Sequence, residues 1–130
     1  MAANFRALRV LVVDDDVLIR WSIAAILAHA GHTVVEAADG AAAIRALQTG
    51  GEDIDAILLD YRLPDSDNLL LLATIRRLVP RSIVILMTAF GTADVATEAI
   101  GMGACHILHK PFEMGDLDLL LQRACEWRGC

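Results

Sequence analysis

The apolar positions of this chain form two patterns, short continuous runs and longer stretches with helical spacing. Apolar runs occupy residues 8–13, interrupted only by Arg9, residues 56–59 and residues 82–87, which begin with Ser82. Shorter stretches with single polar interruptions occupy residues 33–37 and 104–108. These runs are too short for helices, and their many β-branched residues are typical of strands buried on both faces. They therefore predict five strands.

Apolar residues recur at helical spacing in each stretch that follows a strand. The five predicted helices have these inward positions: Ile19, Ile23, Ile26, Leu27 and Ala30; Ala43, Ile44 and Leu47; Leu69, Leu72, Ile75 and Val79; Val95, Ile100 and Met102; Leu117, Leu120, Leu121 and Ala124. Gly31, Gly50 and Pro80 end the first three helices, and Ser66 or Asp67 is expected to cap the third. The fourth helix, residues 92–102, has few large apolar side chains, so we expect it to be the most loosely held.

Strands that alternate with helices predict an α/β fold, a doubly wound (βα)5 parallel sheet with helices on both faces. Ligands of such folds bind beyond the carboxyl ends of the strands. Polar side chains stand at four of these ends: Asp14, Asp15 and Asp16 after the first strand, Asp60 after the third, Thr88 after the fourth and Lys110 after the fifth. The second strand, ending at residues 36–38, offers no comparable group.

Length and charge limit the classes of function. We expect residues 1–130 to form a single domain, because the length allows one core but not two. Only 11 Lys and Arg stand against 17 Asp and Glu, which argues against direct nucleic-acid binding. The longest apolar runs are too short to span a bilayer, so no membrane contact is expected. Cys105, Cys125 and Cys130 contain no CxxC pair, which favours a cytoplasmic location.

The acidic residues at the strand ends predict a metal site. Carboxylates in one small volume repel each other unless a cation is present, and hard oxygen ligands favour Mg²⁺ or Ca²⁺ over zinc. Residues 65–67 lack the glycine and glutamate of a calcium loop, so Mg²⁺ is preferred. Asp16 fits either as a ligand or as the cap of the first helix, and we favour the cap. With Lys110 and Thr88 to contact phosphoryl oxygens, the set suggests an aspartyl phosphate at Asp60.

These motifs resemble the receiver domains of bacterial response regulators over essentially the whole chain. The resemblance rests on residues 12–15 (VVDD), Leu59-Asp60 followed by Pro64, residues 87–89 (MTA) and residues 110–112 (KPF). Arg20-Trp21 and residues 87–91 are similar to receivers of the NtrC type, which precede an ATPase domain and a DNA-binding domain. Together the motifs are highly specific, although each alone is a weak signal.

The resemblance implies a flavodoxin-like sheet with strand order 2-1-3-4-5 and a complete reaction site. Asp60 would accept a phosphoryl group from the phosphohistidine of a sensor histidine kinase or from a phosphotransfer protein. Asp14, Asp15, Asp60 and the backbone carbonyl of Arg62 would hold Mg²⁺. Thr88 and Lys110 would contact the phosphoryl oxygens, with a cis Lys110-Pro111 bond turning the ammonium towards Asp60. The chain would not be an enzyme beyond self-phosphorylation and slow self-dephosphorylation.

The same resemblance implies a switch in which Thr88 moves towards the phosphoryl group. Receivers usually carry Tyr or Phe three residues before the lysine, and here that position is Ile107. A branched aliphatic side chain has no ring to swing, so we expect Ile107 to stay buried and the helix of residues 92–102 to shift instead. The face formed by that helix, the fifth strand and the last helix would then control an output domain or partner, or bind a second copy in a homodimer.

Other functions fit the sequence less well. A haloacid-dehalogenase-like phosphatase places a second Asp two residues after its nucleophile, where this chain has Arg62, and neither common nucleotide-binding glycine motif is present. A receiver fold used as an interaction module without phosphorylation remains the main alternative. His106 and His109 are interpreted as solvent-facing or packing residues rather than as metal ligands. His29 and His32 are assigned to a helix end, and Trp21 and Trp127 to helix packing.

Overall fold

The computed structural model describes residues 5–65, 68–89 and 93–126. Its five parallel strands have the order β2-β1-β3-β4-β5, which confirms the expected flavodoxin-like topology. The elements are β1 (Arg9–Val13), α1 (Val17–His29), β2 (Thr33–Ala37), α2 (Gly40–Gly50), the short 3₁₀ helix η2 (Gly51–Asp53), β3 (Ala56–Asp60), α3 (Asn68–Leu78), β4 (Ile83–Thr88), α4 (Ala93–Gly101), β5 (His106–His109), the 3₁₀ helix η3 (Met114–Asp116) and α5 (Leu117–Glu126).

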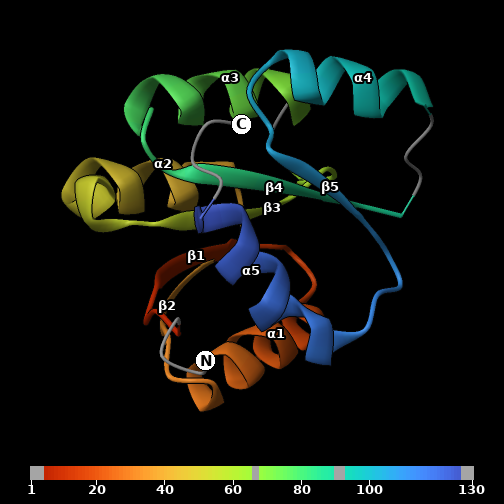
Figure 1. Cartoon of the computed structure of the whole chain (residues 1–130). Coiled ribbons are helices and arrows are strands. Elements are labelled where there is room, and N and C mark those ends of the chain that lie inside the picture. Colours follow the sequence, from red (N-terminus) through yellow and green to blue (C-terminus); the bar gives the residue numbers. More distant parts are fainter. Residues whose placement is uncertain (1–4, 66–67, 90–92, 127–130) are drawn as a thin grey trace.

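Helices cover both faces of the sheet (Figure 1). α1 and α5 lie on one face, and α2, α3 and α4 lie on the other. Side chains alternate along each strand, so Val10 and Val12 pack with Ile23 and Leu121 on the first face. Leu11 and Val13 belong to the core on the opposite face. This alternation explains why the strands read as continuous apolar runs.

The strand register brings the predicted functional residues to one edge of the sheet. Val13 of β1 lies opposite Leu59 of β3, and Asp60 lies opposite Met87 of β4. Thr88 in turn lies opposite His109 of β5. The residues at and just after these ends therefore share the carboxyl edge.

β5 starts two residues later than predicted. Gly103, with φ near +108°, and Ala104, whose N–H donates to the Ala99 carbonyl, close the end of α4, so residue 104 is not free to begin the strand. β5 lies at the edge of the sheet, and Ile107 is only half-buried, which corrects the expectation of a buried side chain. His106 and His109 are both exposed, as expected. The proposed caps Ser66 and Asp67 lie outside the described residues.

Three other side chains differ from the sequence interpretation. His32 is buried, because its Nδ1 accepts from the Leu8 N–H at 2.9 Å and its Nε2 lies 2.6 Å from Asp118 Oδ1. Trp21 is 59% exposed and does not pack into the core, whereas Trp127 lies outside the described residues. Cys125 is buried, and Cys105 is disulfide-bonded, which the cysteine pattern did not predict. Among the described residues, no helix is long and apolar enough to cross a membrane.

Candidate functional site

Three carboxylates gather at the carboxyl edge of the sheet. Asp14 and Asp15 follow β1, and Asp60 is the last residue of β3. Each offers one oxygen such that all three oxygens lie within 4.8 Å of one another. Asp14 is fully buried and Asp60 is 8% exposed, while Asp15 is exposed to solvent. The site therefore has a buried floor and one accessible ligand at its rim.

Lys110 supplies the positive charge beside this cluster. Its Nζ lies 2.9 Å from Asp14 Oδ2 and 3.4 Å from Asp60 Oδ1. The Lys110-Pro111 bond is cis, as predicted, and the Lys110 N–H donates to the Thr88 carbonyl at 2.8 Å. The sequence pointed to a role for Lys110 at the phosphoryl oxygens, but it gave no sign that Asp14 would be the closer partner.

Burial and charge shift the ionisation of both Lys110 and Asp60. Loss of solvation, followed by repulsion from Asp14, raises the pKa of Asp60 to about 6, although Lys110 and the Arg62 N–H act in the opposite direction. Burial alone would lower the pKa of Lys110, but its hydrogen bond to Asp14 and the charges of Asp60 and Asp14 raise it above its ordinary value. Burial and the neighbouring charge of Asp14 thus make ionised Asp60 costly in the absence of a further cation.

Asp16 is the cap of α1, as favoured from the sequence. Its Oδ1 accepts from the N–H groups of Leu18 and Ile19 at 3.0 and 3.2 Å. Its own N–H donates to Asp14 Oδ1 at 2.9 Å. The cap therefore links the start of α1 to the buried acid, and Asp16 is not one of the three clustered carboxylates.

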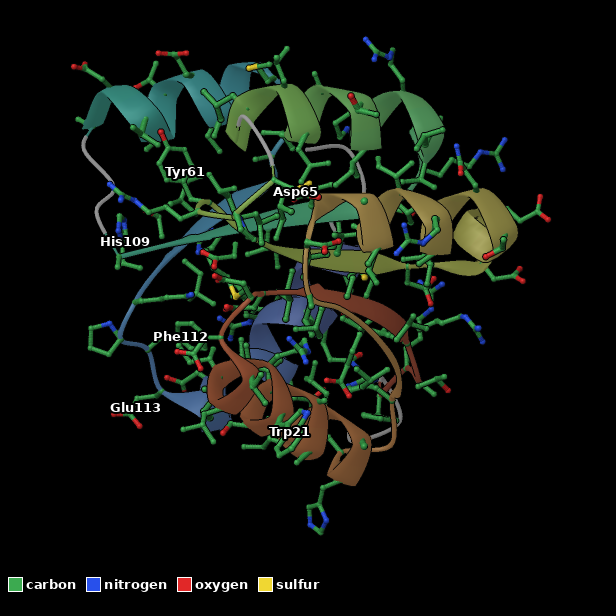
Figure 2. The ribbon with its side chains drawn as sticks, turned by 180° about the vertical axis from the view of Figure 1, so that it is seen from behind. Trp21, Tyr61, Asp65, His109, Phe112 and Glu113 are labelled. Carbon is green, nitrogen blue, oxygen red and sulfur yellow. The ribbon has the colours of Figure 1, made fainter. Side chains whose placement is uncertain are left out.

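Thr88 and Arg62 also lie at the edge of the sheet. Thr88 is the last residue of β4 and is 1% exposed. The Arg62 N–H donates to Asp60 Oδ1 at 3.3 Å, so the backbone after β3 folds back over the acid. A further acid of the same loop, Asp65, accepts from the N–H groups of Gly40 and Ala41 at 2.8 and 3.0 Å. Figure 2 shows Asp65 beside the start of α2, which ties the β3–α3 loop to that helix.

Sequence reasoning missed Arg20 and Glu36. The Arg20 Nη1 donates to the backbone carbonyl of Asp14 at 2.8 Å, and its Nε lies 3.1 Å from Glu36 Oε1. A signal was available, because a cation near the start of a helix opposes the helix dipole and calls for a local partner. The end of β2 therefore does contribute a polar group, because Glu36 holds Arg20 against the Asp14 backbone.

The residues present fit a hard divalent cation. The carboxylates of Asp14, Asp15 and Asp60 are oxygen donors of the kind that Mg²⁺ prefers, and no thiol or imidazole belongs to the cluster. Burial and repulsion from Asp14 raise the pKa of Asp60 even with Lys110 beside it, so a bound cation would favour the ionised acid. Both observations agree with the predicted metal site.

An apolar surface adjoins the site on the side of α1. A cavity of about 340 Å³ is lined by Ile19, Ala89, Lys110, Pro111, Phe112 and Met114. On α1 itself, Val17, Leu18 and Trp21 are 45%, 73% and 59% exposed. Figure 2 shows Phe112 and Glu113 on the segment after β5, and Trp21 on α1. The surface beside the acids is therefore apolar.

Comparison of the sequence with known proteins finds one matching family and several relatives. Residues 10–122 match the response regulator receiver domain. The chain is 40% identical over 115 residues to the DNA-binding transcriptional regulator NtrC of Escherichia coli K12, covering 88% of the chain and 24% of NtrC. It is 40% identical over 119 residues to a putative NtrX-like response regulator of Rickettsia bellii, covering 90% of the chain and 24% of that protein. The chain thus spans about a quarter of the length of these relatives.

Solved structures give the same result. A response regulator receiver domain protein from Clostridium thermocellum superposes with a TM-score of 0.86 at 27% identity, covering 93% of the chain and 96% of that protein. NtrX from Brucella abortus superposes with a TM-score of 0.85 at 34% identity, covering 95% of the chain and 28% of NtrX. The similarity therefore extends over nearly the whole of this chain.

Proposed function

Because the chain belongs to the response regulator receiver domain family, we propose that residues 1–130 form one receiver unit, in which Asp60 accepts a phosphoryl group in a two-component phosphorelay. One observation supports this most strongly: Asp60 lies at the end of β3, within 4.8 Å of the Asp14 and Asp15 oxygens and 3.4 Å from Lys110 Nζ. The carboxyl edge of the sheet thus holds a nucleophile, a set of hard oxygen ligands and the ammonium group of a lysine.

The chemistry is a phosphoryl transfer between two side chains. A carboxylate oxygen of Asp60 attacks the phosphorus of a phosphohistidine whose second ring nitrogen is protonated, and an O–P bond forms. The N–P bond breaks with its electron pair going to the nitrogen, so the donor leaves as neutral imidazole. With its pKa at about 6, Asp60 is mostly ionised at neutral pH and is ready to attack. When bound, Mg²⁺ supplies charge neutralisation, and Asp14, Asp15, Asp60 and the Arg62 carbonyl are the groups that would hold it.

Lys110 and Thr88 take the remaining roles in this proposal. The Lys110 ammonium, already within 3.4 Å of Asp60, neutralises an oxygen of the transferred group. The Thr88 hydroxyl, at the end of the adjacent strand β4, donates to another phosphoryl oxygen. The chain acts as a signalling module, with self-phosphorylation and slow self-dephosphorylation as its only reactions.

The partner that donates the phosphoryl group is a sensor histidine kinase or a phosphotransfer protein. A helix of that partner would pack on the exposed apolar residues of α1 and on the cavity beside Lys110, because this surface adjoins Asp60. We place the phosphoryl transfer, and with it this receiver, in the cytoplasm. The site needs no direct contact with nucleic acid or with a membrane.

Phosphorylation would be read out through α4, β5 and α5. As Thr88 moves towards the phosphoryl group, half-buried Ile107 has no large ring to swing inward, and α4 is the element that shifts. The altered face would bind an output domain, a partner or a second copy of the chain. The NtrC relative is a DNA-binding transcriptional regulator, so control of transcription is the proposed output.

Labelling with acetyl phosphate tests this function. The wild-type chain should gain the mass of one phosphoryl group in the presence of Mg²⁺, and the labelling should stop in excess EDTA. Asp60→Asn should not label, whereas the matched control Asp53→Asn, which changes an exposed acid in η2, should label normally. A wild-type chain that stays unlabelled would support the alternative of an interaction module that works without phosphorylation. Equal labelling in EDTA would instead contradict the role of Mg²⁺.

A further inference from the structure

Arg20 stands at an electrostatically unfavourable place on its helix. It lies one turn after the cap Asp16, and its own N–H donates to the Asp16 carbonyl at 2.9 Å. The amino end of a helix has a partial positive charge, which disfavours a cation there, and the first turn of α1 contains no acid. The side chain is nevertheless only 13% exposed, so it is held against the protein rather than extended into water.

The guanidinium reaches back to the loop that contains the acids. Side chains on a helix tilt towards its amino end, which brings Arg20 over residues 14–16. Nη1 donates to the Asp14 carbonyl at 2.8 Å, while Nε is fixed by Glu36 Oε1 at 3.1 Å. A planar guanidinium can bind both partners at once, whereas a lysine ammonium lacks this geometry.

These contacts complete the restraint of Asp14 on every side. Its N–H donates to the Ala37 carbonyl at 3.1 Å, its Oδ1 accepts from the Asp16 N–H, and its Oδ2 pairs with Lys110. Only the carbonyl remains, and it belongs to the peptide unit that leads to exposed Asp15. Arg20 therefore fixes the orientation of the peptide from which the Asp15 carboxylate projects.

We propose that Arg20 is a positioning residue for the metal site: its guanidinium, held by Glu36, fixes the Asp14–Asp15 peptide so that both carboxylates converge with Asp60. This inference rests on the proposed divalent cation site, but not on phosphoryl transfer. Residues that orient metal ligands typically change metal affinity by roughly 10- to 100-fold when removed. We expect about a tenfold effect here, because Arg20 acts through the backbone.

The direction of the effect separates positioning from simple charge. Removing a nearby positive charge should by itself tighten the binding of a divalent cation, since one repulsive charge is lost. A positioning role predicts the opposite result for Arg20→Met. Arg20→Lys keeps the charge and loses the bidentate geometry. A positioning role therefore predicts weaker cation binding, whereas a simple charge effect predicts no change in binding.

Titration with Mn²⁺, followed by the electron paramagnetic resonance signal of the free ion, measures this affinity in the unphosphorylated chain. We expect binding about tenfold weaker in Arg20→Met, weaker binding in Arg20→Lys, and unchanged binding in Arg123→Met, which removes an exposed cation in the last turn of α5. Glu36→Gln replaces the carboxylate with a neutral amide that holds the Arg20 Nε less strongly, and it should weaken binding by less than Arg20→Met does.

Three results would overturn the proposal, the first two through the role of Arg20 and the third through the metal site. If the wild-type chain binds Mn²⁺ and Arg20→Met binds it equally or more tightly, the role of Arg20 is overturned but the metal site is not. If Arg20→Met does not fold, as judged by circular dichroism, unchanged binding by both Arg20→Lys and Glu36→Gln would do the same. No Mn²⁺ binding by the wild-type chain would overturn the metal site itself, and the positioning role with it.

Discussion

Replacing Asp60 with Asn should make the metal-free protein more stable at neutral pH. Asp60 is 8% exposed, and burial together with repulsion from Asp14 raises its pKa from 3.8 to about 6. An acid whose pKa is higher in the folded state binds its proton more tightly there, so stability falls as the pH rises through this interval. The ionised Asp60 therefore destabilises the folded chain.

The size of the effect follows from the two pKa values. A rise from 3.8 to about 6, at about 1.4 kcal/mol for each unit of pKa, corresponds to roughly 3 kcal/mol at pH 7.5. The attraction of Lys110 is already included in the value of about 6. At pH 4.5 the folded state keeps Asp60 largely protonated, and the cost of ionisation falls to about 1 kcal/mol.

Urea denaturation in EDTA at pH 7.5 and at pH 4.5 tests this reasoning. We expect Asp60→Asn to exceed the wild-type free energy of unfolding by up to about 3 kcal/mol at the higher pH, with about two thirds of that difference lost at the lower pH. Saturating Mg²⁺ should stabilise the wild type more than the variant. Asp53→Asn, an exposed control, should change stability by less than about 0.5 kcal/mol. Equal stability at pH 7.5, or a difference that does not depend on pH, would refute the assigned electrostatics.

Three further predictions follow from individual contacts. His32→Ala should lower the free energy of unfolding in urea by about 2 to 4 kcal/mol, because it leaves the Leu8 N–H without its partner and opens a cavity. The exposed control His29→Ala should be nearly neutral. Similar values for the two variants would show that the buried contacts contribute little. Asp65→Asn should cost about 1 to 2 kcal/mol by the same assay, because the Gly40 and Ala41 N–H groups donate to different carboxylate oxygens and an amide has only one oxygen. An unchanged midpoint would count against this contact. Amide chemical shifts recorded with and without beryllofluoride should change most in α4, and changes concentrated at Ile107 with α4 silent would identify β5 as the moving element instead.

The strand ends were predictable because apolar runs and polar terminators are local signals. Buried strands read as continuous hydrophobic runs, and the topology then places Asp14, Asp60, Thr88 and Lys110 at one edge. The start of β5 was not predictable from its apolar residues alone, since Gly103 and Ala104 serve the end of α4 first. Local pattern gives the existence of an element more reliably than its boundary.

Long-range polar contacts were the part that the sequence did not reveal. His32 pairs with Asp118, which lies 86 residues further along the chain, and Arg20 reaches Glu36 on β2. Neither contact leaves a periodic signal, because only the fold brings the partners together. Trp21 was misassigned for a related reason: the position of a large side chain on a helix does not reveal whether the protein or a partner covers it.

The central claim is that Asp60 carries the phosphoryl group, and locating that group tests it most directly. After Mg²⁺-dependent labelling with acetyl phosphate, borohydride reduction converts an aspartyl phosphate into homoserine, and peptide mass spectrometry identifies its position. We predict homoserine at residue 60 in the wild-type chain and none in Asp60→Asn. Homoserine at Asp14 or Asp15 in the wild-type chain, with residue 60 unchanged, would contradict the account.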